Sequence, residues 1–243
     1  EDASHAKAAQ TNKTSIPEMF RSLFQNPQLL ILMIADLAKW CVKFVTAAAA
    51  IYYFRDAMGN PAYMTGYTLS IAIGAIIGAY MVRFLVQKFD ARTITIGAYI
   101  GMAIFLFLIY IFYSTAILVI ALMTLAQVFY GVAFASSPAL YADTVVYATW
   151  KTGKNAAGWI MGLQNLPLKI GVFLRGVIVA ACLSAVGWQS GAVLEGAARQ
   201  GMTVAFALVP AIFCAAGALL LIVGYRLTKA RVAQYQAEID ARA

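Results

Sequence analysis

The sequence has 243 residues, of which 63% are hydrophobic and only 12% are charged, and its mean hydropathy is +0.78. A soluble domain is about half apolar and a quarter charged, so this excess of apolar surface requires lipid and excludes a soluble protein. The net charge of +8 does not indicate a nucleic-acid partner, because the basic residues form no single patch.

The residues that usually build cofactor or metal sites are sparse. Cys41, Cys182 and Cys214 all lie inside apolar runs, without paired or metal-like spacing, and His5 is the single histidine. Neither a metal site nor a bound cofactor is expected. The sequence also contains no nucleophile–base pair and no phosphate-binding loop, so an enzyme is not expected.

The chain begins with a polar leader, residues 1–27, in which Ser15 to Gln25 could form a short interfacial helix. Six apolar runs follow, at roughly 28–54, 65–87, 94–113, 116–141, 157–186 and 202–226. Each run is long enough to cross a bilayer as a helix, which takes about 20 residues. They lack the alternation of barrel strands, so the sequence predicts an all-α membrane protein with six transmembrane helices. The tail, 227–243, is expected to be a short charged helix or a disordered end.

The basic residues mark the orientation of these spans. Between alternate spans and at the two ends lie Lys7, Lys13, Arg21, Arg83, Lys88, Arg92, Lys151, Lys154, Arg226, Lys229, Arg231 and Arg242. The connectors of the opposite side hold only Arg55 and Arg199. Because positive loops stay inside, both termini are predicted to be cytoplasmic, in a multi-pass protein of the cell (inner or plasma) membrane.

Glycine and proline patterns predict how the spans pack. The G-x-x-x-G spacings at Gly74–Gly78, Gly97–Gly101 and Gly158–Gly162 favour close approach of helices, within the chain rather than between copies. Pro138, Pro167 and Pro210 lie in or near spans and are expected to kink them.

Charged residues inside the spans are the strongest functional signal. Asp36, Lys39 and Lys43 share one helical face, where Asp36 can neutralise one of the two lysines. Arg175 can snorkel toward an interface, whereas Lys169 lies near the middle of its span. Asn165 shares a face with Lys169, and Gln164 flanks that face. This polar stripe beside Pro167 favours a pathway for a small polar solute, with hydrogen bonding between helices as the alternative.

The segment Y-A-D-T-V-V-Y-A-T-W-K-T-G-K-N-A-A-G, 141–158, resembles the glycoside–pentoside–hexuronide:cation symporters of the major facilitator superfamily. That family carries A-D-x-x-D-Y-G-E-x-K-T-G-x-R at the end of its tenth helix. The segment L-Q-N-L-P-L-K-I-G, 163–171, is similar to part of the eleventh helix, and F-Q-N-P-Q-L-L-I-L, 24–32, to the start of the seventh. The resemblance covers nearly the whole chain, but only the second half of such a transporter.

The resemblance implies one major-facilitator bundle of two inverted three-helix repeats, with the leader as the interdomain loop. One bundle has half a cavity, so the expected partner is an N-terminal six-helix bundle, in the same parent chain or a separate subunit, or a second copy of this chain. The coupling cation, Na+ or H+, is expected to bind mainly to acidic residues of that missing half.

The resemblance also implies roles for individual residues. Lys169 is expected near the sugar and the cation, Gln164 and Asn165 as partners of hydroxyl groups, and Phe134 as a ring that stacks on the sugar. Asp143, Tyr147, Lys151 and Lys154 are expected in a cytoplasmic charge network that holds the two halves together. In that segment Val146 and Thr149 stand where the family has acids, and Ala148 and Asn155 where it has glycine and arginine.

The expected function is therefore half of a cation-coupled symporter for a sugar, glycoside or hexuronide, working by alternating access. The surplus of lysine and arginine over Asp36 suggests an anionic substrate, although carboxylates of the missing half could neutralise the same lysines. The loss of the two acids keeps open a non-transporting subunit or regulator that retains the fold. A lipid or lysolipid carrier is the remaining alternative.

Overall fold

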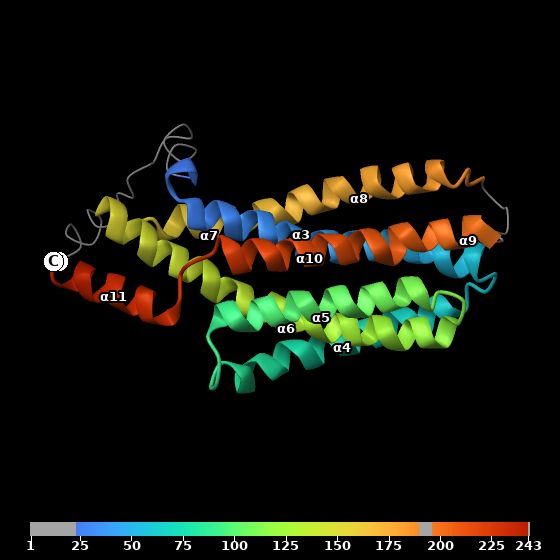
Figure 1. Cartoon of the computed structure of the whole chain (residues 1–243), viewed down its shortest axis with the longest axis horizontal. Coiled ribbons are helices and arrows are strands. Elements are labelled where there is room, and N and C mark those ends of the chain that lie inside the picture. The colour runs from blue at the N-terminus through green and yellow to red at the C-terminus, as the bar shows by residue number, and fades with distance from the viewer. Residues whose placement is uncertain (1–22, 190–195, 243) are drawn as a thin grey trace, which may run out of the picture.

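Figure 1 shows the computed structural model, which describes residues 23–189 and 196–242. Within these ranges the regular elements are all helical, and their labels begin at α3. They are α3 (Pro27–Tyr52), the π-helical turn η1 (Tyr53–Ala57), α4 (Tyr63–Leu85), α5 (Ala91–Ile111), α6 (Ala116–Thr152), α7 (Ala157–Leu163), α8 (Leu166–Ala185), α9 (Gly196–Thr203), the π-helical turn η2 (Val204–Leu208), α10 (Val209–Val223) and α11 (Lys229–Asp240).

Among the described residues, five stretches are long and apolar enough to cross a membrane: α4, α5, α6, α7 with α8, and the run from Ala198 to Val223. The remaining predicted span, 28–54, corresponds to α3, which has 26 residues but contains Asp36, Lys39 and Lys43. At 1.5 Å per residue α3 is about 39 Å long, which is sufficient for a hydrocarbon core of about 30 Å. The all-α membrane class is therefore confirmed.

The long helices pack as two related sets of three. In one set α4 and α5 both pack on α6, and in the other α8 and α10 both pack on α3. Contacts of α5 with α10 and of α3 with α6 join the sets. Exchanging α3 with α6, α4 with α8 and α5 with α10 leaves this pattern unchanged. Because α3 and α6 run in opposite directions (Figure 1), the pattern is that of two inverted three-helix repeats. The repeats are α3, α4 and α5 on one side and α6, α8 and α10 on the other, so each packing set contains helices of both repeats.

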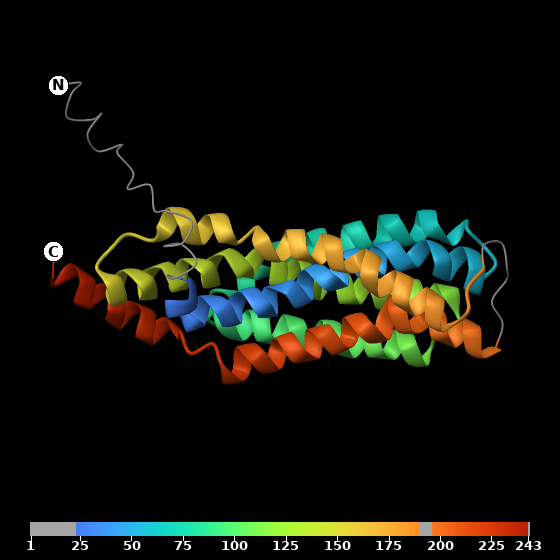
Figure 2. The same cartoon turned by 90° about the horizontal axis from the view of Figure 1, so that it is seen from above.

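The bundle has two distinct ends, which we call the α11 end and the α9 end. Figure 2 shows that the bundle helices share one long axis and that α11 lies beside the last turns of α6. The predicted tail is thus helical between Lys229 and Asp240. The expected interfacial helix at 15–25 falls mostly outside the described residues. The part that the structure describes, Leu23 to Gln25, is helical.

The fourth span is longer than the sequence predicted. We expected it to end near residue 141, but α6 continues to Thr152 and ends at Gly153, which has a left-handed φ of 68°. Ala142 to Thr152 is therefore helical, because this stretch contains no proline or glycine before Gly153. Helix α6 also runs without a break across Pro138, whereas Pro167 and Pro210 lie in the first turns of α8 and α10, just after interruptions.

The α4–α6 seam depends on small residues. A Cβ at Gly78 would meet the carbonyl oxygen of Val128, and a Cβ at Gly131 would meet that of Ala75. Close helix approach is thus confirmed for the Gly74–Gly78 spacing. The prediction of close approach is wrong for Gly158–Gly162. An added Cβ would have no neighbour within 4 Å at either position, because both face away from the other described helices.

We predict that Gly131→Ala lowers stability, because its methyl group has to displace the backbone of α4. Overpacking of this kind costs about 1–3 kcal/mol. The matched control is Gly97→Ala on α5, where a Cβ meets nothing within 4 Å and where alanine favours the helix by about 0.5–1 kcal/mol. Thermal unfolding of the purified protein in detergent measures both, and equal shifts in Tm would contradict the seam.

Candidate functional site

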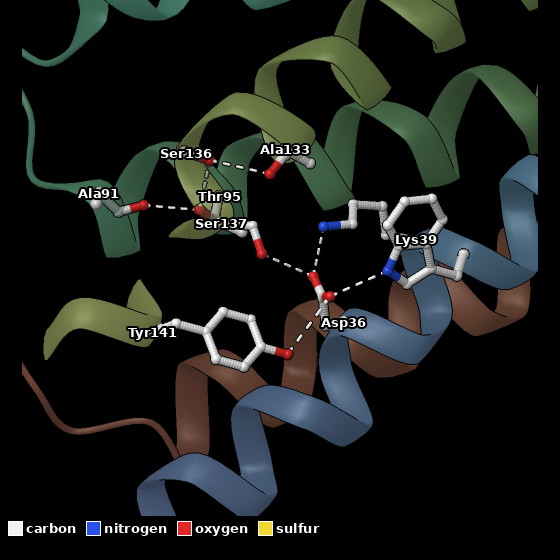
Figure 3. A network of polar contacts seen from close by, with 9 residues as sticks. Asp36, Lys39, Ala91, Thr95, Ala133, Ser136, Ser137 and Tyr141 are labelled. Atoms are coloured by element: carbon white, nitrogen blue, oxygen red, sulfur yellow. Dashed lines mark hydrogen bonds and ion pairs between the residues drawn. The ribbon is translucent and has the colours of Figure 1, made fainter. Parts of the chain in front are cut away.

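A buried carboxylate joins the two central helices. Asp36 on α3 accepts hydrogen bonds at Oδ1 from Lys39 Nζ at 2.6 Å and from Ser137 Oγ of α6 at 2.8 Å. Its Oδ2 accepts from Trp40 Nε1 at 3.2 Å and from the Tyr141 hydroxyl at 3.5 Å. Figure 3 shows Asp36 between Lys39 and the two α6 side chains, so the contact links one helix of each repeat.

Burial makes this contact consequential. The side chains of Asp36 and Lys39 are each only 2% exposed, and a lone charge at this depth would be very costly. A carboxylate has about four acceptor positions, and four donors surround Asp36. The carboxylate is therefore satisfied, and Asp36 has no acceptor position left for a second lysine.

A second polar contact strengthens the same region. Thr95 of α5 and Ser136 of α6 are buried and lie 2.8 Å apart, oxygen to oxygen. Close to the α11 end, the Tyr225 hydroxyl donates to the Leu140 carbonyl at 2.9 Å. These contacts hold α6 just before and just after Ser137, from α5 and from the segment that follows α10.

Aromatic rings and lysines lie together beside this pair. Lys39 Nζ is 5.2 Å from the Trp40 ring centroid and 5.8 Å from that of Phe134. Lys43 Nζ lies 5.3 Å from the Tyr130 ring, and the Phe134 ring is 6.1 Å from both Trp40 and Tyr130. Phe134 is 48% exposed. We call Trp40, Lys43, Tyr130 and Phe134 the α3–α6 face.

The predicted solute residues of the fifth span, Gln164, Asn165 and Lys169, do not lie on this face. The helix is interrupted at Gln164 and Asn165, which separate α7 from α8. Gly171 of α8 packs against Trp40, and Lys169 lies about 200° round the helix from it, away from α3. The Lys169 side chain is exposed, with no hydrogen bond or ion pair to the described residues. Of the predicted set, only Phe134 lies on the α3–α6 face, and Arg175 is exposed elsewhere on α8.

The predicted gate segment contacts α11. Trp150 Nε1 donates to Glu238 Oε2 at 2.6 Å, and the Trp150 ring lies 4.4 Å from that of Tyr235. Tyr147 lies 5.9 Å from Tyr235, ring to ring. Arg242 donates to the Trp150 carbonyl at 3.1 Å. The last turns of α6 therefore carry α11 on one side.

The other members of the predicted charge network are spread over the α11 end. Lys151 Nζ donates to the Gln25 carbonyl at 2.8 Å, and Lys154 is exposed. Asp143 lines a cavity of about 420 Å³ between the α4–α5 turn, α6 and α11, together with Asp90 and Lys229. Among the described contacts of the four predicted network residues, Tyr147 contacts α11, and Asp143 faces α11 and the α4–α5 turn across this cavity.

Several site residues were missed from the sequence. Ser137 and Tyr141 bind Asp36 from another helix, and only their position as polar groups in an apolar span could have indicated them. Trp40 and Tyr130 surround the lysines, but aromatic residues are common throughout the chain, which has 13 tyrosines and 4 tryptophans. Trp150 was noticed only as part of the family segment.

A bundle of two inverted three-helix repeats, with charged and aromatic groups on a half-open central face, has the architecture of each bundle of a major-facilitator transporter. The sequence profile described as MFS/sugar transport protein matches residues 1–229. The chain belongs to this family. The family consists of transporters, which confirms that the chain is not an enzyme.

Individual relatives are about a quarter identical to the chain over the aligned residues. A protein of Salmonella typhimurium provisionally named a sulfoquinovose importer is 28% identical over 96% of this chain and 49% of its own length. The glucuronide carrier protein homolog of Escherichia coli is 26% identical over 91% and 49%. An Escherichia coli protein provisionally named a glycoside/cation symporter is 24% identical over 90% and 48%. The chain thus spans about half the length of these relatives.

We predict that Asp36→Asn destabilises the protein because it leaves Lys39 buried without a counter-charge. Breaking a buried pair costs about 3–5 kcal/mol. The double variant Asp36→Asn/Lys39→Met removes both charges and should regain most of the loss, as measured by thermal unfolding. A double variant no more stable than Asp36→Asn would show that the pair is not the source of the effect.

We also predict that α11 leaves α6 in acid. The hydrogen bonds from Trp150 and Gln234 hold the pKa of Glu238 below its ordinary value. Of these two bonds only the one from Trp150 joins α11 to α6, and the stability that it adds is complete above about pH 4.3, the unfolded value, and is lost as the pH falls through the lower folded pKa. Amide exchange in Lys229–Asp240, corrected for intrinsic rates, should show this loss.

Two substitutions complete the α11 test. Glu238→Gln should weaken amide protection of α11 at neutral pH, because it removes the charge from the bond to Trp150. Asp240→Asn is the matched control, since Asp240 bonds only to Gln236 on its own helix. Equal protection of α11 in both variants would contradict a role for Glu238 in docking.

Proposed function

We propose that this chain is one six-helix half of a cation-coupled symporter for a sugar, glycoside or hexuronide. The observation that carries the proposal is the α3–α6 face, where a half-buried lysine and aromatic rings lie open near the middle of an apolar bundle. Charged groups at this depth are expensive unless they face a partner or a water-filled pathway. Family membership and the names of the relatives favour a sugar pathway.

A second bundle would complete the site. The chain covers about half of its relatives' length, and major-facilitator transporters bind solute between two bundles. We propose an N-terminal six-helix bundle as that partner, from the same parent chain or a separate subunit, with a second copy of this chain as the alternative. Its acidic residues would hold most of the coupling cation, Na+ or H+.

The rigidity of the bundle supports the proposal of alternating access. The α4–α6 glycine seam and the Asp36 contact bind the two repeats into one unit, which favours rocking of whole bundles. Lys169, exposed on α8 away from α3, is proposed to sense the charge of carboxylates on the facing bundle. Gln164 and Asn165, at the helix break, are proposed as hydrogen-bond partners of solute hydroxyl groups.

The orientation proposed is with both termini in the cytoplasm of the cell membrane. Arg83, Lys88, Lys151 and Lys154 gather at the α11 end, whereas Arg55 and Arg199 lie at the α9 end. This is the asymmetry expected when the α11 end faces the cytoplasm.

The expected result in proteoliposomes is sugar uptake by the native assembly, driven by an inward Na+ or H+ gradient and stopped by an ionophore. Methyl β-D-glucuronide and methyl β-D-glucoside are the test solutes. Lys169→Gln should lose accumulation against a gradient, because the cation-sensing charge is gone. Arg175→Gln, on the same helix, is the matched control and should retain it.

Absence of cation-driven flux with glycosides and uronates would overturn symport and favour a non-transporting subunit. Flux of lysolipid without sugar flux would favour the lipid carrier. Retained accumulation in Lys169→Gln would remove Lys169 from the coupling mechanism.

A further inference from the structure

Lys43 is the cation that the buried carboxylate does not neutralise. It is half-buried, one helical turn beyond Lys39 on the same face of α3. Within residues 23–189 and 196–242 its ammonium group has no hydrogen bond or ion pair, and its closest recorded partner is the Tyr130 ring at 5.3 Å. A ring face offsets only part of the desolvation of an ammonium group.

Asp36 cannot serve as the counter-ion of Lys43. Its two oxygens already accept from Lys39, Ser137, Trp40 and Tyr141. The contacts with Lys39 and Ser137 are the shortest, at 2.6 and 2.8 Å. The face therefore keeps one net positive charge, which a ligand or the completing bundle must balance.

The surroundings of Lys43 suit the body of a sugar. Phe134 and Trp40 meet edge to face at 6.1 Å, and Phe134 and Tyr130 stack at the same distance with an angle of 26° between their planes. Sites for small ligands combine apolar and aromatic walls with a few placed polar groups. A pyranose has apolar C–H faces for such rings, and a charged substituent could reach the lysine beside them.

We infer that Lys43 binds the anionic group, a carboxylate or a sulfonate, of the transported sugar, while Phe134 and Trp40 contact its ring. The inference rests on the proposed function, because it takes the ligand to be a sugar derivative. Lys43 would thus be a specificity residue that selects charged sugars over neutral glycosides. Charge-assisted hydrogen bonds of this kind are about twice as strong as neutral ones.

The relatives' names agree with this chemistry. Sulfoquinovose carries a sulfonate and a glucuronide carries a carboxylate, and two of the relatives are named for these solutes. The name of the glycoside/cation symporter does not state whether its substrate is charged. Lys43 itself is identified by the structure alone, because the sequence left open which of the two α3 lysines Asp36 neutralises.

Binding measured by calorimetry on the native membrane assembly in detergent tests the inference without requiring transport. The probes are methyl β-D-glucuronide, sulfoquinovose and neutral methyl β-D-glucoside. The wild type should bind at least one anionic probe about tenfold more tightly than the glucoside, as one charged hydrogen bond allows. Lys43→Gln should abolish that preference and leave glucoside affinity within about twofold, whereas Lys43→Arg should keep it.

The choice between the two anionic probes identifies the group that Lys43 recognises. A wild type that binds neither anionic probe, or binds the glucoside as tightly, overturns the inference. An anion preference that persists in Lys43→Gln overturns it as well. If Lys43→Gln does not fold, as judged by Tm, then Lys43→Met, which keeps the length of the stem, provides the same comparison.

Uptake and binding separate this inference from the proposed function. Cation-driven uptake without a Lys43-dependent anion preference contradicts the inference and leaves symport intact. A Lys43-dependent preference without cation-driven uptake supports the inference and contradicts symport.

Discussion

The carboxylate of Asp36 is the contact on which the arrangement of the central helices depends. It is buried in α3 and accepts from Ser137 and Tyr141 of α6, so it joins the two inverted repeats near the middle of the bundle. In a medium of low dielectric an unpaired polar group is costly, and separating α3 from α6 would remove two of the four donors to Asp36, those of Ser137 and Tyr141. The glycine seam between α4 and α6 and the contact of α5 with α10 build outward from this centre.

The same contact determines the charge of the open face. Because Asp36 is committed to Lys39 and to three neutral donors, Lys43 remains as a positive group among aromatic rings. With both lysines on one carboxylate the net charge would be the same, but it would be shared by two ammonium groups instead of lying on Lys43 alone. The electrostatic character of the proposed sugar site thus follows from the internal packing of α3 and α6.

The fold was largely predictable from the sequence, whereas the site was predictable only in part. Hydropathy gave the positions of the helices, since lipid imposes a long apolar run on each span. The extension of α6 to Thr152 was missed because hydropathy marks where a span leaves lipid, while a helix ends where its backbone bonding ends, here at Gly153. Asp36, Lys39, Lys43 and Phe134 were recognised as candidates. Their partners Ser137 and Tyr141 were not, because contacts between helices leave no local pattern.

An experimental structure of the native assembly with methyl β-D-glucuronide or sulfoquinovose bound would test the central claim most directly. The claim is that Asp36 is satisfied within this chain and that Lys43 is left for the substrate. We expect the anionic group about 3 Å from Lys43 Nζ, with Asp36 still bonded to Lys39. An ion pair between Lys43 and a carboxylate of the completing bundle, with the sugar bound elsewhere, would contradict it.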